Sequence, residues 1–163
     1  MSTVAVYLEA YQLNRERTLG LLDKICQLPD PQQVLAWRPG PGRAHIGWQI
    51  MHVGITEEIF ATERLNPSRP GAFAELWPRF RGGSTPDDQV PSADTIRAVL
   101  AESRQHLIET LKGYGDDRLG EIPPAMAARN LTIRQILGII GWHEAHHQGQ
   151  AHITLNLYQA AQA

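Results

Sequence analysis

The sequence of 163 residues predicts an all-α protein, a four-helix bundle that forms a single domain over residues 1–163. Apolar side chains recur at helical spacing in four long segments, and prolines and glycines interrupt the pattern between them. No segment shows the alternation of apolar and polar residues that is typical of strands. With 42% apolar residues, a chain of this length can bury one core of ordinary size.

The first helix is expected over residues 3–28, where apolar and aromatic residues recur at helical spacing. It should end before Pro29 and Pro31, because proline lacks the backbone donor that a helix needs. The only cysteine, Cys26, lies near this end. A single cysteine excludes an internal disulfide and a cysteine-based zinc site. Because no cationic or metal-ligand neighbour is evident near it, we expect a small buried or half-buried side chain there.

The second helix is expected over residues 45–65, after a loop in which prolines and glycines alternate. By helical spacing, His45, Trp48, His52 and Ile59 share one face. His52 therefore lies in the middle of a helix on a mostly apolar face. Such a histidine is either a core residue with a hydrogen-bond partner or a metal ligand.

A long connection over residues 66–91 should join the second helix to the third. Connections of this length are uncommon in compact domains and often form lids or binding loops. The aromatic residues Phe73, Trp77 and Phe80 indicate that this one is ordered. They either anchor the connection on the helices or line a pocket beside a functional site.

The third helix is expected over residues 92–113, with Ser92 as its N-cap. His106 lies outside its apolar face, which predicts a solvated or rim side chain. The fourth helix should begin at Thr132, because Gln135 three residues later completes a capping box.

The fourth helix, expected over residues 132–158, carries half of a metal site. His143 and His147 are four residues apart, so both imidazoles lie on one helical face and can bind one ion. A Zn²⁺-type site needs three or four ligands. Another helix must therefore supply a further ligand, and His52 is the candidate.

The remaining residues of this region have less certain roles. His152 points away from the pair on a helical wheel, and His146 is offset to one side. We expect His152 to be a bystander, whereas the roles of His45 and His146 stay open. Gln150 is a candidate for orienting a ligand.

Residues 143–147 also match the H-E-x-x-H pattern of zinc peptidases, in which the glutamate is the general base. The extended form of that pattern needs glycine and histidine where this chain has Gln150 and Ile153. The helix also continues past the pattern, and no strand is expected that would bind an extended peptide. A peptidase is therefore disfavoured, and Glu144 remains a candidate general base or a partner of a ligand.

The composition excludes some kinds of partner. Fifteen Lys and Arg residues against seventeen Asp and Glu residues give a net charge of −2, without blocks of like charge. We therefore expect no nucleic-acid partner. No apolar run is long enough to span a bilayer and no secretion signal is visible, so we expect no membrane partner and a cytoplasmic location.

Residues 45–52 (HIGWQIMH) and 142–150 (WHEAHHQGQ) together resemble the DinB-like family, and the resemblance spans essentially the whole chain. It implies a four-helix bundle in which one histidine of the second helix and two of the fourth hold a divalent metal ion, most simply Zn²⁺ or Ni²⁺. Those positions are His52, His143 and His147. The chain departs from the family pattern at Gln148, where arginine is frequent, and at His45, where a serine or threonine cap is frequent.

Three neutral imidazoles leave a bound ion with its full charge and an open position, which suits catalysis. The resemblance favours a metal-dependent S-transferase for a low-molecular-weight thiol. A metal-dependent hydrolase and a non-enzymatic metal-binding protein of a stress response are the alternatives. Arg79 and Arg81 are candidates for binding a carboxylate of the substrate, although a solvated loop explains them equally. Family members often form homodimers, and the apolar residues Ile133 and Leu137 suggest the same here.

Overall fold

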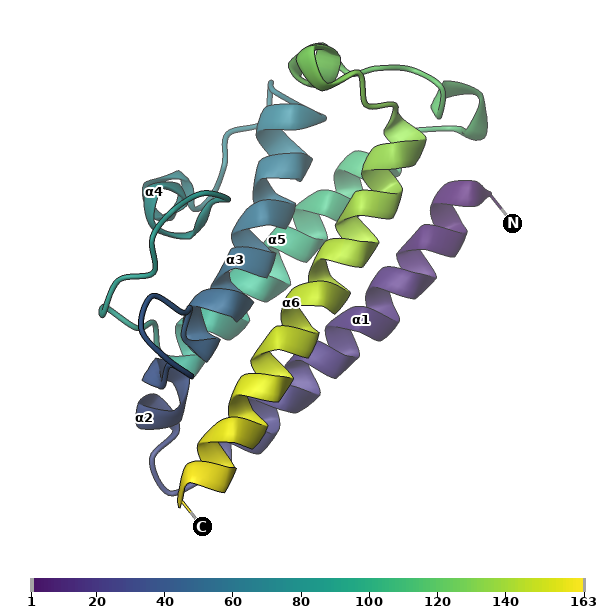
Figure 1. The fold of residues 1–163 in the computed structure, drawn as a ribbon. Coiled ribbons are helices and arrows are strands. Elements are labelled where there is room, and N and C mark those ends of the chain that lie inside the picture. Colours follow the sequence, from purple (N-terminus) through teal and green to yellow (C-terminus); the bar gives the residue numbers. More distant parts are fainter. Residues whose placement is uncertain (1, 163) are drawn as a thin grey trace.

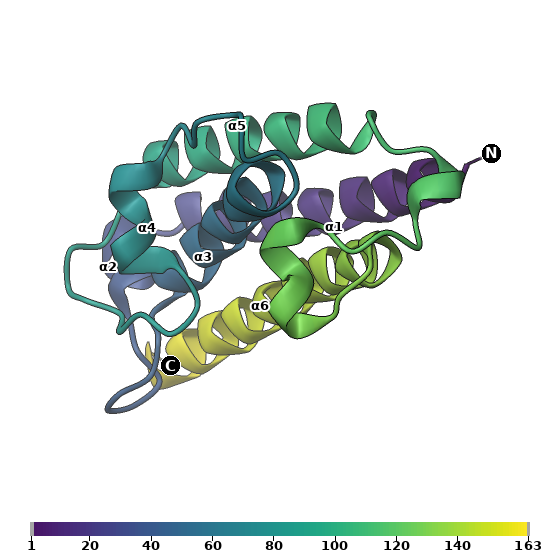
Figure 2. The ribbon, with the colours of Figure 1, turned by 90° about the horizontal axis from the view of Figure 1, so that it is seen from above.

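The computed structural model describes residues 2–162, and every regular element in this range is helical. The predicted all-α class is therefore confirmed. Four long helices lie side by side (Figures 1 and 2). They are α1 (Thr3–Cys26), α3 (Ile46–Ile59), α5 (Ala93–Leu111) and α6 (Ile133–Gln162).

The order of the long helices explains the long connection in the middle of the chain. In Figure 1, α1 and α6 run downward, whereas α3 and α5 run upward. Because α3 and α5 are parallel neighbours, the segment that joins them must run back along the length of the bundle. Helix α3 also packs against α6. The two helices that carry the predicted metal ligands are therefore neighbours.

The starts of α5 and α6 follow the predicted capping chemistry. Ser92 Oγ accepts a hydrogen bond from the backbone N–H of Thr95 at 3.2 Å. At the start of α6, the Gln135 N–H donates to Thr132 Oγ1 at 3.3 Å, and the Thr132 N–H donates to Gln135 Oε1 at 2.9 Å. These reciprocal bonds form the predicted capping box.

The end of the first helix differs from the prediction. Helix α1 ends at Cys26, whose side chain is exposed and not buried as expected. A short helix α2 (Pro31–Ala36) follows, which the sequence analysis did not predict. Asp30 caps α2 by accepting a hydrogen bond from the Gln33 N–H at 2.9 Å. Aspartate followed by proline is itself a helix-start signal, because proline fits the first helical position.

The connection between α3 and α5 is ordered, as its aromatic residues indicate. Helix α3 passes directly into a π-helical turn, η1 (Phe60–Arg64), and two short helices follow, η2 (Ala74–Leu76) and α4 (Trp77–Phe80). The Phe80 side chain is 1% exposed, so it anchors α4 on the core. Between α5 and α6 lie two further 3₁₀ turns, η3 (Asp116–Arg118) and η4 (Pro124–Arg129).

Each long helix contributes one charged side chain to a buried cluster. Arg15 of α1 bonds Glu57 of α3 at 2.7 Å and Glu144 of α6 at 2.8 Å. Arg104 of α5 bonds each of the same two carboxylates at 2.5 Å. Burial alone would raise the pKa of Glu57, but Arg15 and Arg104 lower it overall. The two positive and two negative charges balance, so these four side chains tie the four helices together.

The apolar residues from which a homodimer was expected do not lie on the surface. Ile133 and Leu137 are buried in the protein's own core, so that reason for a dimer is wrong, and the dimer stays a prediction from the family resemblance.

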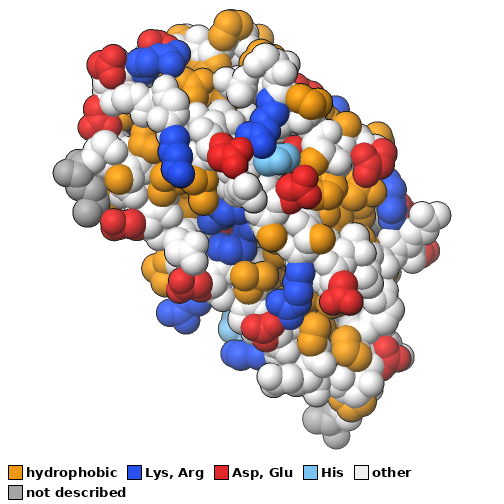
Figure 3. Space-filling view, turned by 180° about the vertical axis from the view of Figure 1, so that it is seen from behind, with side chains coloured by type: hydrophobic (Ala, Val, Ile, Leu, Met, Phe, Trp, Pro, Cys, Tyr) orange, Lys and Arg blue, Asp and Glu red, His pale blue; other side chains and the backbone are white. Residues whose placement is uncertain are grey.

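On the face opposite the view of Figure 1, acidic and basic side chains are interspersed (Figure 3). No helix within residues 2–162 combines the length and apolarity that crossing a membrane requires.

Candidate metal centre

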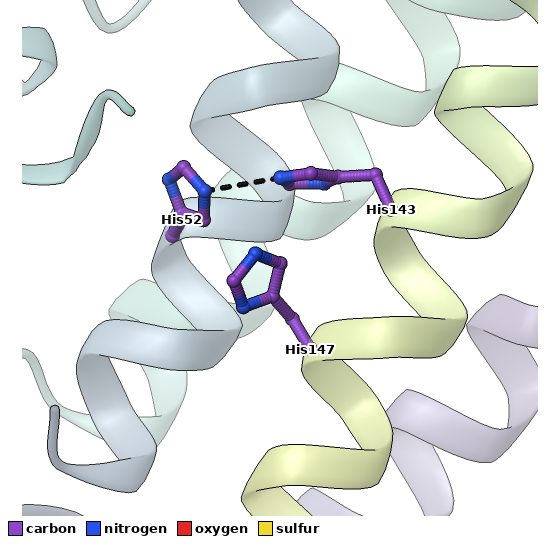
Figure 4. A group of neighbouring side chains, drawn as sticks. All are labelled: His52, His143 and His147. Atoms are coloured by element: carbon purple, nitrogen blue, oxygen red, sulfur yellow. Dashed lines mark hydrogen bonds between the residues drawn. The ribbon is translucent and has the colours of Figure 1, made fainter. Parts of the chain in front are cut away.

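The three histidines predicted as ligands meet between α3 and α6. Figure 4 shows His52 reaching from α3 toward His143 and His147 on α6. One ring nitrogen of each lies within 4.8 Å of the others, and Nε2 of His52 and Nε2 of His143 are 3.0 Å apart. Zn–N bonds of about 2.0–2.1 Å place ligating nitrogens roughly 3–3.5 Å apart. The donor set therefore fits a divalent ion that prefers imidazole.

Two of the rings are held by carbonyl oxygens on the side away from the trio. Nδ1 of His52 donates to the backbone carbonyl of Phe80 at 2.6 Å, and Nδ1 of His147 donates to Oε1 of Gln49 at 2.5 Å. A carbonyl oxygen only accepts, so each Nδ1 carries the ring proton. The lone pair of Nε2 in each ring then remains free for an ion.

Trp48 fixes the plane of the His52 ring. The two rings stack with centroids 4.6 Å apart and an angle of 15° between their planes. The indole Nε1 of Trp48 donates to the backbone carbonyl of Arg79 at 3.0 Å, which holds the indole in place. The connection between α3 and α5 thus positions His52 twice, through the Phe80 carbonyl and through Trp48.

The three rings are neutral at physiological pH. Burial lowers the pKa of His143 to about 3, with further contributions from the neighbouring His52 and His147. Burial and then His52 lower the pKa of His147 to about 4, and burial also lowers the pKa of His52. Neutral imidazole is the form that binds a metal ion.

These pKa values predict how the stability of the metal-free protein depends on pH. As the pH falls below about 6.5, the unfolded chain takes up protons at His143 and His147, whereas the folded protein does not until about pH 3–4. Protons therefore favour unfolding, and stability falls as the pH falls from about 6.5 toward 3. The contribution of the two rings is on the order of a few kcal/mol. Thermal unfolding of chelator-treated protein between pH 7.5 and 5 measures it.

The double variant His143→Ala/His147→Ala is the matched control for this effect. It lacks both rings, so its melting temperature should depend less steeply on pH over the same range. An identical slope in the wild type and the double variant would contradict the lowered pKa values.

A cavity of about 420 Å³ opens beside the trio. Its ionisable lining groups are the three histidines together with Arg64, Arg81 and Arg129. Phe60, Met126 and other apolar side chains complete the wall. The volume lies within the usual range for small-molecule sites.

Gln49 contacts the trio of histidines, and the sequence analysis missed it. It is buried on the mostly apolar helix α3, three residues before His52, and that buried polar position is the signal that would have found it. We predict that Gln49→Ala lowers Zn²⁺ affinity roughly 10- to 100-fold, because it removes the group that holds the His147 ring. Calorimetric titration with Zn²⁺ measures the effect. Gln12→Ala, an exposed substitution on α1, should leave the affinity unchanged.

The structure places Glu144 away from the three histidines. Its carboxylate bonds Arg15, Arg104 and the hydroxyl of Thr18, and the residue is 1% exposed. All of these partners lie on α1 and α5, on the other side of α6 from the cavity lining. Glu144 was a candidate general base or partner of a ligand, and its carboxylate instead contacts arginines in a buried ion pair that joins the helices.

The four other histidines lie outside the trio. His45 is the N-cap of α3, where its Nδ1 accepts from the Trp48 N–H at 3.0 Å. The exposed His146 stacks on Trp142, with ring centroids 4.8 Å apart, and accepts a hydrogen bond from Gln150 at 2.9 Å.

The prediction for His152 is confirmed, because the side chain is exposed, whereas His106 is half-buried, which fits the rim alternative and not the solvated one. The His106 side chain is 12% exposed, and its Nδ1 lies 2.8 Å from the buried carboxylate of Glu58. A buried carboxylate is costly without a hydrogen-bond partner, and the His106 ring supplies one to Glu58.

Comparison with known proteins supports the family that the sequence resembles. The family model of the DinB superfamily matches residues 10–151, a range that includes all three histidines of the trio. No curated protein and no solved structure matches the chain.

Proposed function

The chain belongs to the DinB superfamily, and we propose that it is a metal-dependent S-transferase for a low-molecular-weight thiol. His52, His143 and His147 hold the divalent ion, most simply Zn²⁺ or Ni²⁺. The observation that carries this proposal is the meeting of three neutral imidazoles beside a cavity whose other ionisable groups are all arginines.

The cavity suits a thiol better than water as the nucleophile. A free thiol has a pKa of about 8.5, whereas that of bulk water is about 15.7, so a thiol needs far less help to lose its proton. A bound divalent ion would hold a thiol as its thiolate. The three arginines add positive charge around the same space, which favours the thiolate further. No carboxylate among the described residues lines the cavity to act as a base for water.

The reaction forms one bond between the thiol sulfur and an electrophilic carbon. The thiol proton passes to solvent, and the leaving group departs with its electron pair. The chain's own residues set the geometry of the metal ligands, because the Phe80 carbonyl orients His52 and Gln49 orients His147.

The test is conjugation of a thiol to an aryl halide by protein loaded with Zn²⁺ or Ni²⁺. Thioether formation from cysteine or glutathione and 1-chloro-2,4-dinitrobenzene is followed by absorbance. We expect turnover that stops on addition of a chelator and returns with metal. His143→Ala should abolish it, whereas the exposed His152→Ala should retain it.

Two results would contradict the proposal in different directions. Metal-dependent cleavage of simple esters or amides without conjugation would identify a hydrolase. Stoichiometric metal binding without either reaction would identify a metal-binding protein that is not an enzyme.

A further inference from the structure

Three arginines from two connections converge on the cavity beside the histidines, two from the α3–α5 connection and one from the α5–α6 connection. Arg64 ends the π-helical turn η1, Arg81 follows α4, and Arg129 ends η4. After Arg129 the chain turns at Asn130, which has a φ of 51°. Asparagine tolerates this left-handed conformation better than most residues, so the turn that presents Arg129 has a local cause.

These arginines differ from most others in the protein. Seven arginines form salt bridges with carboxylates, namely Arg15, Arg38, Arg69, Arg79, Arg97, Arg104 and Arg118. Within residues 2–162, Arg64, Arg81 and Arg129 form no salt bridge and no side-chain hydrogen bond. Arg79, the other sequence candidate for binding a carboxylate, pairs with Asp87 at 2.8 Å. The cavity therefore gathers guanidinium groups that still have their hydrogen-bond donors free.

The unpaired charges act on one another. Burial lowers the pKa of Arg64, and the positive charges of Arg129 and Arg81 lower it further, while Glu63 raises it. The Arg64 guanidinium lies over the Phe60 ring, 4.4 Å from its centroid, which fixes its position at the cavity wall. An anion bound among the three arginines would relieve this repulsion.

We propose that the cavity binds a small molecule with two or more negative charges, carried by carboxylates or by a phosphate, through Arg64, Arg81 and Arg129. This inference rests on the proposed function, since it assigns the charged part of the thiol substrate to the arginines and its sulfur to the histidine end of the same cavity. Guanidinium groups pair with carboxylate and phosphate through two parallel hydrogen bonds, which gives both affinity and orientation. Ile59, Met126 and Leu131 would contact the carbon skeleton of the molecule.

Calorimetric titration of the zinc-loaded full chain at low ionic strength tests the proposal without relying on activity. The probes are succinate, inorganic phosphate, mercaptosuccinate and the uncharged thiol 2-mercaptoethanol. We expect succinate or phosphate to bind, and the tighter of the two identifies the kind of anion. Arg81→Gln and Arg129→Gln should each weaken that binding about tenfold or more, because each removes a charge-assisted contact.

The control variant is Arg17→Gln, which replaces an exposed arginine on α1 outside the cavity and should leave anion binding unchanged. Arg81 and Arg129 are themselves exposed, so their variants should unfold at the same temperature as the wild type. The proposal is overturned if neither succinate nor phosphate binds the wild type. It is also overturned if the double variant Arg81→Gln/Arg129→Gln binds the anion with wild-type affinity.

The probes also separate this inference from the proposed function. Conjugation of 2-mercaptoethanol as fast as that of mercaptosuccinate, unaffected by the arginine variants, would overturn the anion site while supporting thiol transfer. Arginine-dependent binding of succinate or phosphate without metal-dependent conjugation would support the anion site while contradicting the transferase.

Discussion

Replacing His147 by alanine should lower the affinity for Zn²⁺ by orders of magnitude and abolish metal-dependent activity with it. The substitution leaves two imidazoles, His52 and His143, where three converge in the structure. Two ligands hold a divalent ion far more weakly than three. Metal content after dialysis against a weak chelator, together with calorimetric titration, measures the loss.

The matched control is His146→Ala, which removes the adjacent histidine. His146 is exposed and stacks on Trp142, so its loss should change the affinity for Zn²⁺ little. His147 and His146 point about 100° apart around the helix axis. The two variants therefore test which helical face binds the ion, and not only whether histidine is needed. If His146→Ala emptied the site while His147→Ala kept its metal, the pairing of His143 with His147 would be wrong.

Replacing Glu144 by alanine should destabilise the fold by about 3–5 kcal/mol, because it leaves buried charge without a partner. Arg15 and Arg104 would then share only the carboxylate of Glu57. Chemical denaturation of the metal-free variant measures the change in the free energy of unfolding. Glu9→Ala, an exposed substitution on α1, should change that energy by no more than about 0.5 kcal/mol.

This substitution also separates the two roles considered for Glu144. A structural ion pair predicts lost stability, and it predicts that any folded, metal-loaded protein retains activity. Unchanged stability with full metal content and lost turnover would instead restore Glu144 as a general base.

The sequence predicts the fold class and the metal ligands because both depend on local spacing. The period of apolar residues predicts the long helices, and the four-residue interval between His143 and His147 places both rings on one face whatever surrounds them. The capping residues Ser92 and Thr132 predict where α5 and α6 begin. Two ligands need a third, and the position of His52 in the middle of an apolar helical face together with the family resemblance indicates that residue.

The partners of Glu144 depend on tertiary packing and could not be predicted in this way. Its position next to His143 suggests a catalytic role, yet the helix turns its carboxylate toward two arginines that lie far away in the sequence. His106 shows the same limit, because only the packing of α5 on α3 brings it to Glu58. Neither partner follows from the pattern of a single helix.

The contribution of the α3–α5 connection to the site could not be predicted from the sequence either. Its breakers and aromatic residues predict an ordered segment but not which backbone carbonyl meets His52. That carbonyl belongs to Phe80, and the next residue, Arg81, lines the cavity. A connection without long regular elements therefore supplies both a support for the metal ligand and part of the charged wall.

X-ray absorption spectroscopy of the protein loaded with one equivalent of Zn²⁺ tests the three-histidine site most directly. We predict three imidazole nitrogens at about 2.0–2.1 Å, completed by one or more oxygen ligands and by no sulfur from the protein. On addition of a thiol, one sulfur should enter at about 2.3 Å while the three imidazoles remain. Zinc with two imidazoles or fewer, or with carboxylate oxygens in their place, would contradict a site built from His52, His143 and His147.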